Sequence, residues 1–179
     1  MTPQTQTLFP QPGDDGTSAL RFQLAQRAKS GAQWFFWIAA LSLMTSVISL
    51  VGGEWAFFVS LGVTQLIDAV AVQALAPRLG EVVKVVAFAF DVLAAATFAA
   101  MGYFAAQRQA WAFVAGMALY LLDALLFLAL LALAPDFRGF LVIAFHAYVL
   151  YSVFGGYKAC TRLAEMGGEV PPPPVATPA

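Results

Sequence analysis

A series of long apolar segments, separated by short polar breaks, is the feature that most constrains how this chain can fold. Five segments can be distinguished, at about residues 34–53, 55–76, 83–105, 110–134 and 139–160. A helix needs roughly 20 apolar residues to cross about 30 Å of hydrocarbon, and each segment reaches that length. The pattern predicts an all-α integral membrane protein, a helical bundle with five transmembrane helices.

Composition agrees with a membrane environment and excludes several other classes of protein. Of the 179 residues, 61% are apolar and 11% are charged, whereas soluble domains have about 45–50% apolar and about 25% charged residues. A formal net charge of −1, without a basic run, argues against nucleic acid as a partner. The single cysteine, Cys160, excludes a disulfide framework and a cysteine-based zinc site.

The second apolar segment is more polar than the others and leaves the number of spans open. It contains Gln65 and Asp68 on one helical stripe. We therefore also consider four spans plus one interfacial or re-entrant helix. Lysine and arginine gather on the cytoplasmic side of membrane proteins, and both arrangements then place the N-terminus in the cytoplasm. They place the C-terminus on opposite sides.

The polar ends of the chain differ from the apolar body. We expect residues 1–32 to be a disordered N-terminal tail with a short basic amphipathic helix, because Pro, Gln, Thr and Gly are frequent there. Residues 33–160 form the predicted transmembrane bundle. Residues 161–179 include four consecutive prolines and are predicted to be a disordered Pro-rich tail.

Small residues in the third segment predict a close contact between helices. Ala95, Ala99, Gly102 and Ala106 recur at helical spacing. Small side chains let helix backbones approach one another inside a membrane, where no hydrophobic force acts between helices. The segment at 83–105 is therefore expected at the centre of the bundle.

Four ionisable residues inside the apolar segments form the candidate site: Asp68, Asp91, Asp123 and His146. A charged side chain at the middle of a membrane helix costs about 2.5–3.5 kcal/mol, so such residues normally face protein or water. Their positions along the five predicted helices correspond to similar depths, which predicts that they converge. Ser46, Gln65 and Tyr120 are candidates for a surrounding shell of polar groups.

Three roles for this cluster follow from its chemistry. The groups could link helices through hydrogen bonds. They could handle protons or a polar substrate, since buried Asp and His exchange protons. Asp91, Asp123 and His146 could also hold a metal, although no paired-ligand motif supports this. No cofactor is expected. Motifs of serine hydrolases, metalloproteases and phosphate-binding loops are missing from the sequence. We therefore favour a non-enzymatic role and keep an intramembrane enzyme as the third alternative.

Two strings carry a resemblance to known proteins. Residues 111–123, WAFVAGMALYLLD, and residues 145–151, FHAYVLY, resemble small multi-pass bacterial membrane proteins of unknown function. The resemblance covers most of residues 34–160. It implies a helical membrane fold and brings no activity, ligand or catalytic residue.

These observations predict a transporter-like membrane protein with a buried Asp/His site and an unnamed ion or small-molecule substrate. The alternative is a structural or accessory subunit that packs against a partner membrane protein or a second copy of itself. The lipid bilayer is the expected environment in both cases. The composition, rich in Ala, Val and Leu, suits a bacterial inner (cytoplasmic) membrane.

Overall fold

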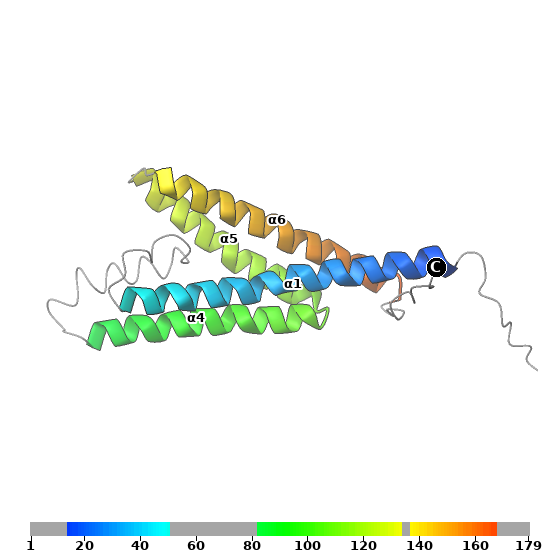
Figure 1. Cartoon of the computed structure of the whole chain (residues 1–179), viewed down its shortest axis with the longest axis horizontal. Coiled ribbons are helices and arrows are strands. Elements are labelled where there is room, and N and C mark those ends of the chain that lie inside the picture. Colours follow the sequence, from blue (N-terminus) through cyan, green and yellow to red (C-terminus); the bar gives the residue numbers. More distant parts are fainter. Residues whose placement is uncertain (1–13, 51–81, 134–136, 168–179) are drawn as a thin grey trace, which may run out of the picture.

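Four long α-helices make up the described part of the protein. The computed structural model describes residues 14–50, 82–133 and 137–167. The helices are α1 (Asp14–Leu50), α4 (Val82–Ala106), α5 (Ala110–Leu133) and α6 (Phe137–Glu165) (Figure 1). The prediction of an all-α fold is confirmed for these residues.

A tight turn separates α4 from α5. None of the four helices contains proline, so no helix is interrupted where a backbone donor would be missing. At the turn, Arg108 adopts a φ of 63°, and its backbone N–H donates to the carbonyl of Ala105 at 2.9 Å. The N–H of Ala112 donates to the carbonyl of Gln109 at 3.1 Å and so begins α5. The short connection makes α4 and α5 antiparallel neighbours.

The helices form two antiparallel pairs, α1 with α4 and α5 with α6. The pairs lie together at the end that holds the turn at residues 107–109 and diverge toward the opposite end (Figure 1). Side-chain contacts follow the same directions. A Cβ on Gly102 would lie 3.1 Å from Cβ of Phe35, while Ser46, farther along α1, hydrogen-bonds to Asp91, which precedes Gly102 in α4.

The prediction of five spans is not supported. All four helices contain stretches long and apolar enough to cross a membrane: Gly16–Ile48, Val85–Ala106, Ala110–Leu133 and Gly139–Glu165. The other predicted span, residues 55–76, lies outside the described residues. Helices α1 and α4 are antiparallel (Figure 1), and the described residues contain four helices of membrane-spanning length.

Large apolar side chains cover the outside of the bundle. Leu93 is 64% exposed, Leu122 is 62% exposed and Tyr151 is 70% exposed. In water such a surface would be unfavourable, because apolar surface is driven away from water. Lipid chains solvate it without that penalty, so the exposed surface and the helix lengths together indicate a lipid environment.

The core lies where α1 meets the other three helices. Phe35 of α1 is 1% exposed, and its ring stacks on Phe98 of α4 and contacts Phe113 of α5. On the neighbouring face, Gly31 of α1 meets Gly156 of α6 so closely that a Cβ on Gly31 would lie 2.6 Å from Cα of Gly156. The glycine pair therefore brings the backbones of α1 and α6 into direct contact.

Helix α1 is longer than a membrane is thick. Its 37 residues span about 55 Å at about 1.5 Å per residue. Residues 14–32, predicted to be a separate tail and helix, continue directly into the first span, and α6 likewise continues to Glu165. The boundaries at 32/33 and 160/161 stay predictions, and neither coincides with a break in a helix.

Candidate functional site

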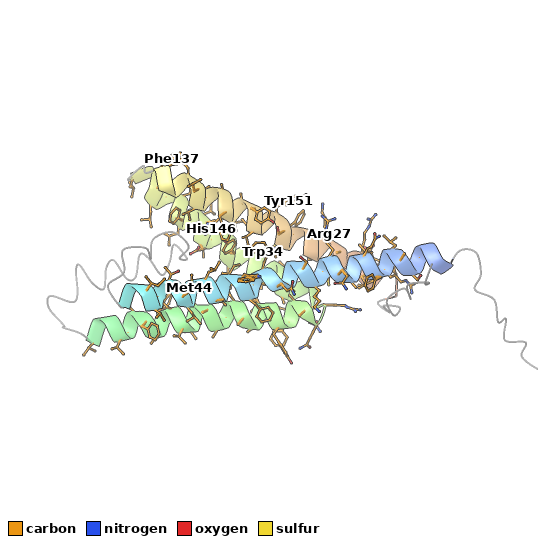
Figure 2. All side chains as sticks on the ribbon, viewed as in Figure 1. Arg27, Trp34, Met44, Phe137, His146 and Tyr151 are labelled. Carbon is orange, nitrogen blue, oxygen red and sulfur yellow. The ribbon has the colours of Figure 1, made fainter. Side chains whose placement is uncertain are left out.

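A buried pair of ionisable side chains joins α5 to α6. His146 Nε2 lies 3.2 Å from Oδ2 of Asp123, and the two residues are 4% and 3% exposed. Asp123 lies near the middle of α5, and His146 lies in the first half of α6 (Figure 2). The antiparallel packing of the helices brings these positions together. Both belong to the predicted cluster.

Two aromatic rings enclose the imidazole of His146. The ring of Tyr120 stacks on it with centroids 4.8 Å apart and an interplanar angle of 10°. Phe127 lies at 6.0 Å with an angle of 17°. Both rings come from the same helix as Asp123, at the spacing i, i+3, i+7 that places residues on one helical face. The rings limit the movement of the imidazole while leaving its nitrogen atoms free to make hydrogen bonds in the ring plane.

The backbone contact of His146 restricts where its protons can lie. Nδ1 is 2.8 Å from the carbonyl oxygen of Val142. A carbonyl oxygen only accepts hydrogen bonds, so Nδ1 carries a proton when this bond is made. A hydrogen bond between Nε2 and Asp123 then needs one further proton, on the carboxyl or on the ring. With that proton the pair is neutral overall, and without it the pair carries one negative charge.

Asp91 occupies a different place and does not join this pair. It is 1% exposed and lies where α4 packs on α1, in hydrogen-bonding contact with Ser46. Its Oδ1 has no hydrogen-bond partner within the described part of the chain, and the same holds for the buried hydroxyl of Ser42. The predicted convergence is therefore divided in two: Asp123 with His146 and Tyr120, and Asp91 with Ser46.

Two of the predicted site residues, Asp68 and Gln65, lie outside the described residues. Within residues 14–50, 82–133 and 137–167, no group of three or more His, Cys, Asp or Glu side chains is arranged to hold a metal. The proposed metal ligands Asp91, Asp123 and His146 therefore gain no support as a set.

A continuous series of rings connects the Asp123–His146 pair to the core. Tyr120 meets Phe98 edge-on with centroids 6.2 Å apart, and Phe98 stacks on Phe35 at 6.5 Å. Sequence reasoning included Tyr120 but missed Phe127 and Phe98. The spacing of Phe127 from Asp123, one turn along α5, was a usable signal for the first. Nothing in the sequence pairs Phe98 of α4 with α5.

Comparison with known proteins gives no further guide to the site. No protein-family model, no curated protein and no solved structure matches the chain. Function is therefore argued from the geometry of the described residues.

Proposed function

We propose that this chain is a transporter-like membrane protein in which Asp123 and His146 take up and release one proton as a unit. The observation that carries the proposal is the buried contact between His146 Nε2 and Asp123 Oδ2, made while Nδ1 is held by the Val142 carbonyl. Ionisable residues inside membrane helices commonly mark proton and ion pathways.

The electrostatics of the Asp123–His146 pair support a coupling between release of its proton and binding of a cation. Losing the shared proton leaves a negative charge among apolar side chains, which is unfavourable in a medium of low dielectric constant. A cation that enters beside Asp123 would offset this charge and favour release of the proton. The site would then exchange one positive charge for another. Monovalent cations and protonated amines are the substrate class that this chemistry accepts.

The second buried acid, Asp91, extends the polar interior to the α1–α4 contact. Together with Ser42 and Ser46 it places three polar side chains, each no more than 4% exposed, on a neighbouring helix pair. We propose that Asp91 is a second position for a proton or cation, separate from the Asp123–His146 pair.

The distribution of basic residues supports a cytoplasmic N-terminus in this four-helix arrangement. Six basic residues lie at the end of the bundle that holds the 107–109 turn: Arg21, Arg27, Lys29, Arg108, Lys158 and Arg162. Lys84 and Arg138 lie at the first turns of α4 and α6, at the opposite end. Under the positive-inside rule, the end with the turn faces the cytoplasm. We place the protein in a bacterial inner membrane on composition alone.

Proton movement by reconstituted protein tests the proposal. Liposomes that contain the protein and a trapped pH-sensitive dye are given a gradient of K⁺ or Na⁺ across the membrane, without an ionophore. We expect the wild-type protein to move protons in the direction opposite to the cation, so that an inward cation gradient alkalinises the interior, and Asp123→Asn to reduce the rate at least tenfold. Ser152→Ala, which alters an exposed hydrogen bond to the Tyr148 carbonyl, serves as the control and should behave like the wild type.

Two results of that assay would contradict the proposal. One is the absence of proton movement by the correctly folded wild-type protein for either direction of the cation gradient. The other is an unchanged rate in Asp123→Asn. Either result would leave the pair as a hydrogen-bonded link between α5 and α6.

A further inference from the structure

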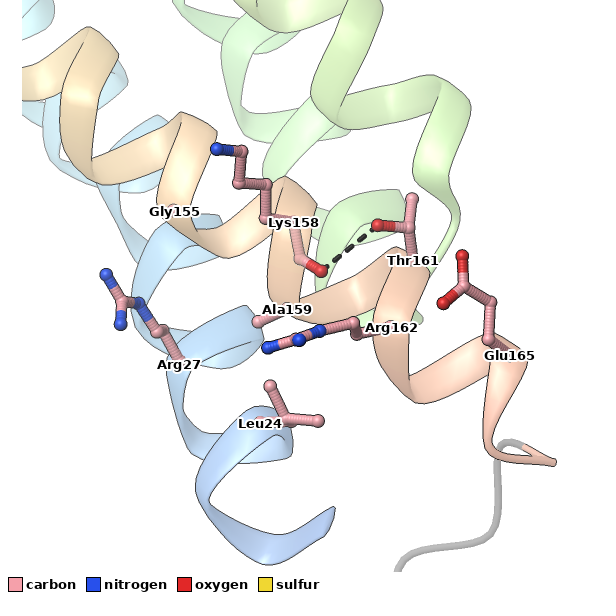
Figure 3. Close-up of a pocket in the computed structure, with 8 residues that line it drawn as sticks. All are labelled: Leu24, Arg27, Gly155, Lys158, Ala159, Thr161, Arg162 and Glu165. Atoms are coloured by element: carbon pink, nitrogen blue, oxygen red, sulfur yellow. Dashed lines mark hydrogen bonds between the residues drawn. The ribbon is translucent and has the colours of Figure 1, made fainter. Parts of the chain in front are cut away.

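A pocket lies between α1 and α6, at the end of the bundle that holds the 107–109 turn, away from the Asp123–His146 pair. Its volume is about 520 Å³. It is lined by two residues of α1 and six of α6, shown in Figure 3: Leu24, Arg27, Gly155, Lys158, Ala159, Thr161, Arg162 and Glu165. Neither the proton site nor the core packing uses these charged side chains.

The charge of the pocket is strongly positive. Three of its side chains are basic, Arg27, Lys158 and Arg162, and one is acidic, Glu165. None of the three basic side chains forms an ion pair with a carboxylate within the described ranges. Glu165 lies at the far side of the group from Arg27 (Figure 3). The pocket therefore holds a net positive charge with donors available to an anion.

The three basic side chains are exposed, and each lies against or between groups of α6 or α1. The guanidinium of Arg27 lies over Gly155, where a Cβ would be 3.4 Å from Nε and 3.5 Å from one terminal nitrogen. Lys158 Nζ lies 4.6 Å from the centre of the Phe154 ring. Arg162 extends from α6 toward α1, between Leu24 and Ala159 (Figure 3). Two helices thus present their charges to one space.

A neighbouring arginine takes a different role, which separates it from the pocket. Arg21 donates a hydrogen bond of 2.7 Å to the carbonyl of Met166, just beyond the end of α6. Helix C-termini carry partial negative charge that favours nearby cations. Arg21 donates to this carbonyl at the end of α6. Arg27 and Arg162 are therefore not needed there and are available to a ligand.

The pocket lies at the level where the bundle leaves the hydrocarbon. Cys160 Sγ donates to the carbonyl of Arg108 at 3.2 Å, so the pocket residues of α6 flank the α4–α5 turn. Near this turn Trp111 is 51% exposed and Tyr103 is 60% exposed, and such side chains prefer the headgroup level of a membrane. Lipid phosphate groups occupy the same level.

We propose that this pocket binds a phosphate group, supplied either by the headgroup of an anionic phospholipid or by a soluble phosphate. Arginine recognises phosphate through paired N–H donors, and Arg27 and Arg162 offer two such groups from different helices. Lysine adds a point charge. Basic pockets between membrane helices on the cytoplasmic side bind anionic headgroups for these reasons.

Equilibrium binding to the full chain in detergent tests the proposal, with two probes. The first is a fluorescent phosphatidic acid, compared with a phosphatidylcholine of the same chains. The second is radiolabelled inorganic phosphate in equilibrium dialysis. We expect Arg27→Gln to weaken binding about fivefold, and the double variant Arg27→Gln/Arg162→Gln about twenty-five-fold, from the usual contribution of each basic residue near an anionic surface. Lys29→Gln removes an exposed α1 cation outside the pocket and should bind like the wild type.

A second variant separates this pocket from a merely basic surface. Gly155→Leu keeps every charge but places a side chain where the guanidinium of Arg27 lies, so it should weaken binding although the net charge is unchanged. Thermal unfolding of each sample shows whether the variants fold. If the double arginine variant does not fold, Gly155→Leu still tests whether the pocket binds the probes.

The outcomes assign the ligand or overturn the proposal. Preference for phosphatidic acid over phosphatidylcholine, lost in the pocket variants and kept in Lys29→Gln, assigns the site to a lipid headgroup. Binding of inorganic phosphate with the same pattern assigns it to a soluble phosphate. Equal binding of both lipids with no binding of phosphate would overturn the proposal. Binding that is unaffected by the pocket variants would overturn it as well.

Discussion

Replacing Gly156 by alanine should strongly destabilise the folded protein. A Cβ at this position would lie 2.7 Å from Cα of Gly31 and 3.1 Å from the ring of Phe113. The first contact is with backbone, which cannot rotate away as a side chain can. The α1–α6 pair would have to separate, and we expect a loss of about 3 kcal/mol, the upper part of the range for overpacked interiors.

The adjacent glycine provides a matched control for this experiment. A Cβ on Gly155 meets only the guanidinium of Arg27, at 3.4 Å or more, which is ordinary contact with a flexible side chain. Gly155→Ala should therefore unfold at nearly the wild-type temperature in the same detergent, whereas Gly156→Ala unfolds at a clearly lower one. Equal midpoints for the two variants would contradict the close α1–α6 crossing.

Replacing His146 by leucine should lower the free energy of unfolding at least as much as Gly156→Ala does. The substitution takes the ring nitrogen away from Asp123 and leaves the carboxyl among apolar side chains. Removing one member of a buried ion pair typically costs about 3–5 kcal/mol. It also removes the face on which Tyr120 stacks. We expect a large drop in the midpoint of thermal unfolding.

The double variant Asp123→Leu/His146→Leu distinguishes the cause of that loss. Replacing both members of a buried pair with apolar residues is often neutral or stabilising, so the double variant should recover most of the stability lost in His146→Leu. A double variant as unstable as the sum of the two single variants would show that the residues act independently, against the observed contact.

The helical membrane fold could be predicted from the sequence because long apolar segments leave few alternatives. The number of spans could not, since Gln65 and Asp68 made the second segment ambiguous by composition. The centre of the bundle was also missed. Small residues predicted a close helix contact for the segment at 83–105, and Gly102 does pack against side chains of α1. The backbone contact between Gly31 of α1 and Gly156 of α6 was not predicted. Single glycines outside a repeated pattern give no signal of which helix they will meet.

The residues of the candidate site could be predicted from the sequence, but the contacts between them could be predicted only in part. Asp91, Asp123 and His146 are conspicuous in apolar segments, and all three are buried. Which of them meet depends on how the helix pairs are arranged. These three residues have similar predicted depths in both the five-span and the four-span arrangement, but a shared depth does not say which helices pack together. The contact between Asp123 and His146 needs only antiparallel α5 and α6, which their short connection dictates, whereas the place of Asp91 depends on α1.

The protonation of His146 is the most direct measure of the central claim, because this is the single histidine of the chain. With ¹⁵N-labelled histidine, each ring nitrogen gives one signal, whose position reports whether that nitrogen carries a proton. We predict that the Nδ1 signal reports a protonated nitrogen, and that the Nε2 signal of the wild type moves reversibly as the pair gains and loses its shared proton and differs in Asp123→Asn. An Nε2 signal that never moves and is the same in both proteins would contradict the account and leave the pair as a structural link.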